Sequence, residues 1–130
     1  MRVGPNRNTI EPPKRMNLTF SISEQDGGIQ ILKVHDLLSE HSNKEILKAV
    51  QQRIDDGYNR FVVDLSQIRY MNSVGLNFLI TLRARSQEEG GDIAVANPSQ
   101  KVMDLLDMTK LTPIFRISPS VEQAAAEVAV

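Results

Sequence analysis

Alternating apolar and polar residues near the amino terminus predict an extended hairpin. Leu18, Phe20 and Ile22 fall on one side of a strand, and hydroxyl-bearing residues lie between them. The Asp-Gly-Gly sequence at 26–28 supplies residues that tolerate a positive φ, which tight turns require. The apolar run at 29–34 then returns as a second, more buried strand. The pattern therefore predicts two strands joined by a short turn.

The rest of the chain alternates between helical and extended patterns. Apolar residues at helical spacing predict an amphipathic helix over 43–56, with Ser42 or Asn43 as its N-cap and Gly57 as its left-handed C-terminal cap. Near the end of the chain, Pro119 is expected near the first turn of a helix, where its missing donor costs nothing. The order ββαβαβαβα implies crossover connections, a mainly parallel sheet and an α/β fold. The remaining elements are expected as strands at 61–65, 92–96 and 114–117, and as helices that follow Ser73, the turn at 97–99 and the turn at 118–120.

The segment from Phe61 to Leu79 joins a strand to a helix through a polar loop. Its first five residues form a short apolar run typical of a strand covered on both faces, and Met71 closes the loop that follows. Asn72 and Ser73 then stand before a second apolar stretch, where their side-chain oxygens would cap the first free N–H groups of a helix. This arrangement places a serine hydroxyl at the positive end of a helix dipole.

This segment carries a resemblance to a known family. It resembles the signature of the bacterial anti-sigma factor antagonists, the STAS domains. In that family a serine that follows an acidic residue is phosphorylated by a partner kinase that is also an anti-sigma factor; the matching serine here is Ser73. Two positions depart from the pattern, because Asn72 replaces the acidic residue and Val74 follows the serine. The residues that carry the resemblance are Asp64-Leu65-Ser66 and Met71-Asn72-Ser73-Val74-Gly75-Leu76.

The resemblance implies a fold and a function. It covers residues 17–130 and implies a single STAS-like domain with a mixed sheet of four to five strands and about four helices. The implied function is that of an anti-sigma factor antagonist, which binds an anti-sigma factor or serine kinase until Ser73 is phosphorylated and is restored by a PP2C-type phosphatase. The alternative, which Asn72 favours, is a non-switching scaffold or an accessory subunit of a sensory assembly or membrane transport system. The expected partner contacts are Asp36, Ser66, Met71, Asn72, Ser73, Val74, Gly75 and Leu76.

Composition narrows the class of protein. The 130 residues suit one domain, and a net charge of −1 gives no sign of bulk electrostatic binding to nucleic acid. Residues 1–16 hold four basic residues and one acidic residue, so this proline-rich stretch carries +3 and the remainder −4. We expect residues 1–16 to form a flexible basic arm. The absence of cysteines, of a long apolar span and of an apolar leader suits a cytoplasmic protein, and the resemblance implies a bacterial one.

The sequence offers no catalytic constellation. His35 and His41 match no metal-ligand spacing, and the chain has no phosphate-binding or dinucleotide-binding glycine loop. We therefore expect no enzymatic activity, no metal and no cofactor.

Asp64, at the end of a buried strand, invites comparison with the phosphoacceptor of response-regulator receivers. That family also needs an acidic pair after its first strand and a lysine after its last strand. Here Glu24 and Asp26 precede a hairpin instead of a crossover helix, and Arg116 lies inside the last expected strand. Asp64 is therefore expected to cap or brace the loop that follows it.

Overall fold

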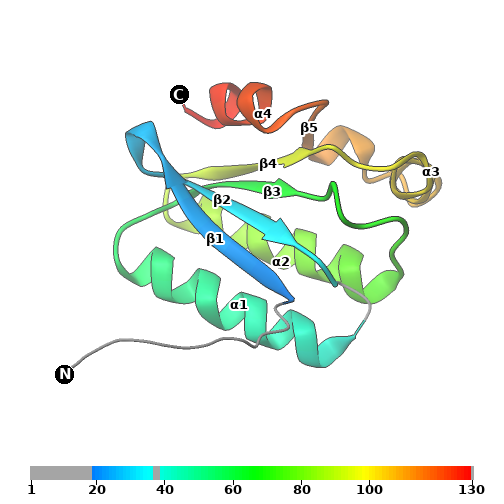
Figure 1. Cartoon of the computed structure of the whole chain (residues 1–130), viewed down its shortest axis with the longest axis horizontal. Helices are drawn as coiled ribbons and strands as arrows, with labels where there is room; N and C mark the ends of the chain where they lie inside the picture. The colour runs from blue at the N-terminus through cyan, green and yellow to red at the C-terminus, as the bar shows by residue number, and fades with distance from the viewer. Residues whose placement is uncertain (1–18, 37–38, 130) are drawn as a thin grey trace.

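The structure is a computed structural model that describes residues 19–36 and 39–129. The expected basic arm at 1–16 lies outside the described residues. The five strands form one sheet in the order β1-β2-β3-β4-β5, in which only the β1–β2 pair is antiparallel (Figure 1). The expected hairpin and mainly parallel mixed sheet are therefore confirmed. The strands are β1 (Phe20–Gln25), β2 (Ile29–Val34), β3 (Arg60–Asp64), β4 (Asp92–Ala96) and β5 (Arg116–Ser118).

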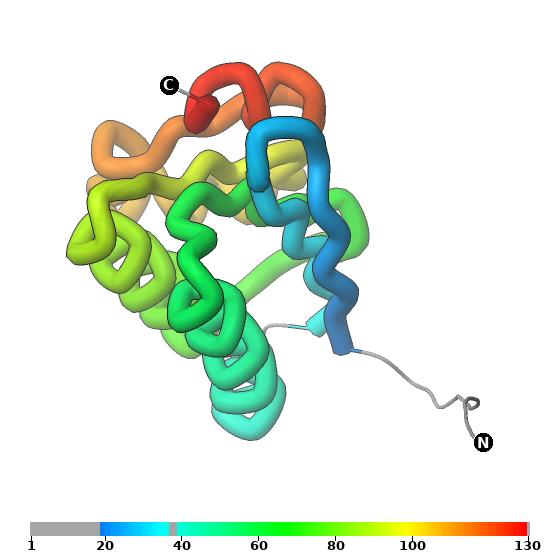
Figure 2. The backbone as a smooth tube through the Cα atoms, turned by 90° about the vertical axis from the view of Figure 1, so that its left-hand side faces the viewer, coloured from blue at the N-terminus to red at the C-terminus, as the bar shows by residue number. Residues whose placement is uncertain are grey.

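Helices cover both faces of the sheet, as parallel strands require. In Figures 1 and 2, α1 and α2 lie together beneath the sheet and α4 lies above it, while α3 is set beyond the ends of β3 and β4. This arrangement confirms the order ββαβαβαβα in a single α/β domain. The helices are α1 (Glu40–Asp55), α2 (Ser73–Glu88), α3 (Gln100–Met108) and α4 (Val121–Val128).

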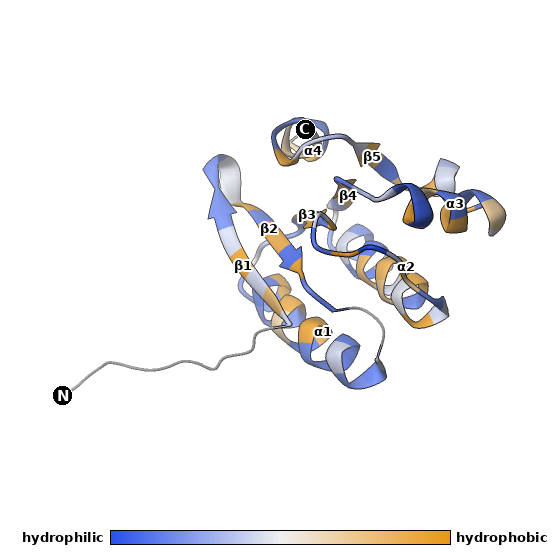
Figure 3. Cartoon of the chain, turned by 45° about the vertical axis from the view of Figure 1, so that its right-hand side comes forward, coloured by the Kyte–Doolittle hydropathy of each residue, from blue (hydrophilic) through white to orange (hydrophobic). Residues whose placement is uncertain are grey.

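Two apolar layers of unequal size hold the fold together. The larger layer packs α1 and α2 against one face of the sheet (Figure 3). Phe61, Phe78 and Leu82 belong to this layer and are fully buried. The smaller layer, beneath α4, uses short side chains such as Ala94 and Ala124. Large buried side chains contribute most of the hydrophobic free energy, so the α1–α2 side supplies most of the stability.

Several boundaries differ from those expected; β3, for example, lies one residue earlier than the expected 61–65. Helix α1 begins three residues early, because the Ser39 Oγ accepts the backbone N–H of Ser42 at 3.1 Å and caps the helix there. Strand β5 begins later than expected, since Thr112–Ile114 forms a 3-10 turn, η2. Pro119 lies directly before the N-cap Ser120 of α4, near the first turn as expected.

Two positions require glycine, one for its backbone conformation and one for lack of space. Gly57 follows α1 with a φ of 103°, which confirms the expected left-handed cap. Gly91 has no such conformation, but a Cβ built on it would lie 1.8 Å from the backbone oxygen of Asn59. The chain between α2 and β4 therefore requires glycine for space at this point.

Candidate functional site

The end of β3 is fixed by a buried carboxylate. Asp64 is only 7% exposed, and its Oδ1 accepts the backbone N–H of Ser66 at 3.0 Å and the side-chain amide of Asn97 at 3.1 Å. Asn97 follows the neighbouring strand β4, whose last residue pairs with Asp64 in the sheet. These bonds tie the start of the β3–α2 loop to the neighbouring β4–α3 turn. The expected bracing role of Asp64 is confirmed.

The β3–α2 loop is anchored at two apolar points and exposed between them. Ile68 and Met71 are buried in the larger core layer, whereas Arg69 and Tyr70 are exposed. The Ser99 Oγ donates to the backbone oxygen of Arg69 at 2.6 Å and so ties the middle of the loop to the start of α3. The loop therefore presents its polar side chains from a fixed backbone.

The first turn of α2 presents a serine to solvent. Asn72 is the N-cap of the helix, and its Oδ1 accepts the backbone N–H of Val74 at 3.0 Å and of Gly75 at 3.3 Å. Of the two expected caps, Asn72 is therefore confirmed, whereas Ser73 lies inside the helix and caps nothing. Ser73 is the first helical residue; it is exposed, and its hydroxyl has no hydrogen-bond partner among the described residues. The positive end of the helix dipole lies at the same place.

The other expected partner contacts differ in accessibility. Ser66 is exposed and Val74 is half-buried, so both present atoms at the surface. Met71, Gly75 and Leu76 are buried and support the loop and the first turn from below. Contact between these residues and a partner stays a prediction.

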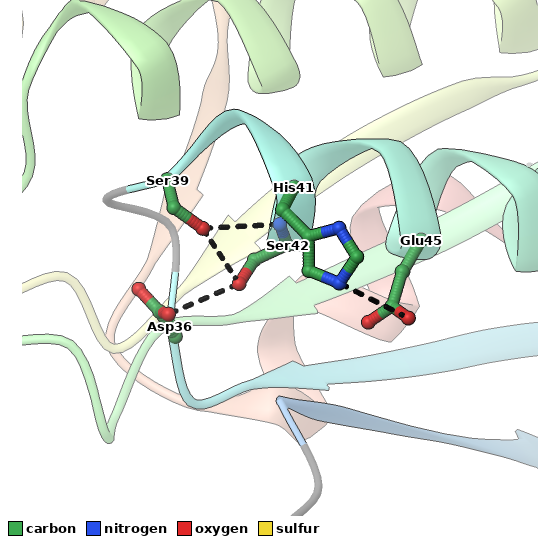
Figure 4. A network of polar contacts seen from close by, with 5 residues as sticks. All are labelled: Asp36, Ser39, His41, Ser42 and Glu45. Atoms are coloured by element: carbon green, nitrogen blue, oxygen red, sulfur yellow. Dashed lines mark hydrogen bonds and ion pairs between the residues drawn. The ribbon is translucent and has the colours of Figure 1, made fainter.

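Asp36 takes part in a polar network at the start of α1 (Figure 4). Its Oδ2 accepts the hydroxyl of Ser42 at 3.0 Å, and the Ser42 hydroxyl also accepts that of Ser39 at 3.0 Å. Beside Ser42, the side-chain amide of Asn43 donates to the backbone oxygen of Val74 at 2.6 Å. The network therefore holds the β2–α1 loop to the start of α1, and the separate Asn43 bond connects α1 to the first turn of α2.

Sequence reasoning assigned Asn43 only a possible capping role. The residue is buried, and it lies on the face of α1 that Ile46, Val50 and Ile54 share. A polar residue in phase with an apolar stripe was the signal for a buried hydrogen bond. Its partner, Val74, lies 31 positions further along the chain, beyond the reach of local patterns.

The described residues show no feature of a metal site. No group of three or more His, Cys, Asp and Glu side chains in the described ranges could hold an ion. His41 pairs with Glu45 at 3.5 Å on the exposed face of α1, one helical turn apart, which is a common surface arrangement (Figure 4). In the described part of the chain, no helix has the length and apolar character needed to cross a membrane.

Comparisons with known proteins agree with this geometry. The STAS domain family matches residues 21–124. The anti-sigma F factor antagonist of Paenibacillus polymyxa is 27% identical over 120 residues, which cover 88% of this chain and 98% of that protein. A curated relative from Thermotoga maritima is 28% identical over 75 residues, and this match spans 66% of the relative's length and 58% of this chain.

Solved structures share the fold. The crystal structure of TM1081 from Thermotoga maritima has a TM-score of 0.77 at 25% identity and covers 85% of this chain and 95% of its own. SpoIIAA in its unphosphorylated form has a TM-score of 0.72 at 16% identity and covers 83% and 94%, which shows a common fold alone. This chain belongs to the STAS domain family and, within it, resembles the anti-sigma factor antagonists, which are regulators rather than enzymes.

Proposed function

We propose that the protein is an anti-sigma factor antagonist whose binding is switched off by phosphorylation of Ser73. In this proposal the unphosphorylated protein acts in the bacterial cytoplasm and binds an anti-sigma factor that is also a serine kinase, and a PP2C-type phosphatase restores the binding form. The observation that carries the proposal is the exposed Ser73 hydroxyl at the first position of α2, beside a loop whose backbone is fixed at its start and in its middle.

A phosphoryl group on Ser73 would be compatible with the folded domain. It would add about −1.5 to −2 charges next to the positive end of the α2 dipole, where negative charge stabilises a helix. The Asn72 cap involves a different side chain and could remain in place. SpoIIAA, which shares this fold, has been solved in a phosphorylated form. Phosphorylation would therefore act on the interface and leave the fold intact.

The expected size of the effect is sufficient for a switch. A partner that covers Ser73 in the unphosphorylated complex would have to desolvate the phosphate or leave a gap around it. A loss of about 3 kcal/mol of binding free energy corresponds to an affinity roughly 150-fold weaker. A change of this size moves a partner between bound and free states at ordinary protein concentrations.

Asn72 is compatible with this mechanism. The family usually has an acidic residue here, but asparagine offers the same Oδ1 acceptor, which holds two N–H groups of α2. What the substitution removes is a negative charge beside the serine. We therefore expect it to change the kinase's preference for its substrate more than the shape of the site.

The test compares four bait proteins in a lysate of the native cell: the wild type, Ser73→Asp, Ser73→Ala and the control Ser23→Asp. Ser23 is an exposed serine of β1, so the control adds the same charge far along the chain from the loop. We expect the wild type, Ser73→Ala and Ser23→Asp to capture an anti-sigma factor or serine kinase that Ser73→Asp does not capture. With ATP, the purified partner should add one phosphoryl group (about 80 Da) to the wild type but none to Ser73→Ala. Equal affinity of the wild type and Ser73→Asp for this partner would refute the switch.

The second candidate is a STAS scaffold or an accessory subunit of a sensory assembly or transport system, without a switch. Asn72 favours it, because a non-switching protein has no need for the acidic residue before the serine. Intact-mass measurement on protein from its native cell distinguishes the two candidates. A phosphorylated form that maps to Ser73 supports the switch, and its absence under every growth condition supports the scaffold.

A further inference from the structure

Tyr70 is an exposed aromatic residue that the fold holds in place. Its side chain is 56% exposed, although it follows Arg69, whose backbone oxygen is tied to Ser99 at 2.6 Å. The ammonium group of Lys101, in the first turn of α3, lies 6.0 Å from the centre of the tyrosine ring. A cation–π contact at an exposed site is worth about 0.5–1 kcal/mol, so it favours this position of the ring. The domain thus displays a pre-ordered aromatic side chain three positions before Ser73.

The charged residues that adjoin Tyr70, Arg69 in the sequence and Lys101 over its ring, are both basic and exposed. The sequence has no acidic residue at 65–77 or at 97–103, and the nearest acidic residues along the chain are the buried Asp64 and the exposed Asp104. These two stretches therefore carry +2 in a chain whose net charge is −1. The first turns of α2 and α3, at the ends of these stretches, add the positive ends of two helix dipoles.

We propose that the docking surface extends from Ser73 across Tyr70 to Lys101 and fits an acidic face of the partner. We call this the loop–α3 surface, defined by Arg69, Tyr70, Ser73 and Lys101. The inference rests on the proposed function and adds the chemistry of the partner. Tyr70 is the anchor, because tyrosine buries a large rigid area at low entropic cost and is enriched at interface centres. Arg69 and Lys101 select an acidic partner and speed its association.

Because of this charge pattern, phosphorylation of Ser73 alone could weaken binding across the whole loop–α3 surface. Phosphorylation of Ser73 adds about −1.5 to −2 charges, which nearly cancels the +2 of the surrounding stretches. An acidic partner then meets an almost neutral surface with a phosphate at its edge. The switch would therefore combine a local steric effect with the loss of electrostatic complementarity.

The experiment measures dissociation constants and association rates for the purified partner that wild type captures and Ser73→Asp does not. The variants are Tyr70→Ala, Tyr70→Phe, Arg69→Glu and Lys101→Glu, and Lys48→Glu on the exposed face of α1 is the matched control. Tyr70→Ala should bind about 30-fold more weakly, as expected for an aromatic anchor, whereas Tyr70→Phe should stay within about threefold. Each charge reversal on the surface should weaken binding about five- to tenfold, mainly through slower association, and Lys48→Glu should change little.

Salt provides a second readout that a purely structural role would not change. Wild-type affinity should fall between low and physiological salt, and this dependence should be smaller for Lys101→Glu. Thermal unfolding of each variant near the wild-type temperature establishes that the domain is folded. Wild-type affinity in Tyr70→Ala and both charge reversals, with Ser73→Asp still inactive, would overturn the loop–α3 surface and leave the switch standing. If Ser73→Asp binds like wild type, both proposals fail.

Discussion

Replacing Asn72 by alanine removes the side-chain acceptor for two backbone N–H groups of α2. The Asn72 Oδ1 lies 3.0 Å from the nitrogen of Val74 and 3.3 Å from that of Gly75. Loss of an N-cap of this kind costs about 1 kcal/mol, within a range of roughly 0.5–2. For a domain slightly above 100 residues, this corresponds to a fall in melting temperature of about 3–5 °C.

The assay is urea unfolding followed by circular dichroism, with three matched variants. Asn72→Asp keeps the acceptor and adds charge at the positive end of the helix, so it should remain within about 0.5 kcal/mol of the wild type. Asn77→Ala removes the same side chain from an exposed position beyond the first turn of the same helix. It should leave stability unchanged or raise it slightly, because alanine is the better helix former.

The same variants separate stability from recognition. If the missing charge before Ser73 limits the kinase, Asn72→Asp should be phosphorylated faster than the wild type, whereas Asn77→Asp should not. The capping argument is refuted if Asn72→Ala unfolds at the wild-type urea midpoint, or if Asn77→Ala loses as much stability as Asn72→Ala.

Three other changes test the packing around the site. Leu82→Ala empties a fully buried position in the larger core layer and should cost about 2–5 kcal/mol in urea unfolding. Gly91→Ala places a methyl group against the backbone oxygen of Asn59, so it should cost about 1–3 kcal/mol or more and lower the melting temperature. Asp64→Ala leaves two donors, including the amide of Asn97, without their acceptor and should cost about 1–3 kcal/mol in the same measurement.

Each of these changes has a control that shares its chemistry. Ile80 is exposed on α2, the helix that also contains Leu82, so Ile80→Ala should change stability little. Gly27 has open space around it, so Gly27→Ala should show only the conformational cost of its φ of 85°, about 1–2 kcal/mol, without the steric overlap expected at Gly91. Asp104 is an exposed carboxylate that accepts one side-chain amide, so Asp104→Ala should be nearly neutral. A control as destabilising as its partner would contradict the packing argument.

Local sequence patterns predicted the bounds of an element correctly where the flanking residues allow only one start and one end. The strands at Ile29–Val34 and Asp92–Ala96 have the expected bounds, because each is an apolar run between turn residues. The predicted start of α1 was wrong, because Ser39, Ser42 and Asn43 are all residues that cap helices well. The choice among them depends on tertiary partners. The sequence alone does not reveal those partners.

The candidate site likewise has features that local sequence predicted and features that it did not. The Asn72 cap and the helix beginning at Ser73 followed from the dipeptide and the apolar stretch after it. The bonds that hold the loop were not predicted, because Asp64 with Asn97 and Arg69 with Ser99 are separated by 33 and 30 positions. Parallel register brings the ends of β3 and β4 together. Residues that follow β3 therefore contact residues that follow β4, although neither segment of sequence indicates this contact.

The unequal layers on the two faces of the sheet imply unequal resistance to local opening. Helix α4 has eight residues, too few to be stable alone, and it contacts the sheet through small side chains such as Ala124 and Ala125. Its detachment would leave the larger layer intact, so backbone amides of α4 should exchange with deuterium earlier than those in the middle of α2. Partial unfolding would then begin at the carboxyl-terminal helix, while α2, which bears Ser73, remains folded on the opposite face of the sheet.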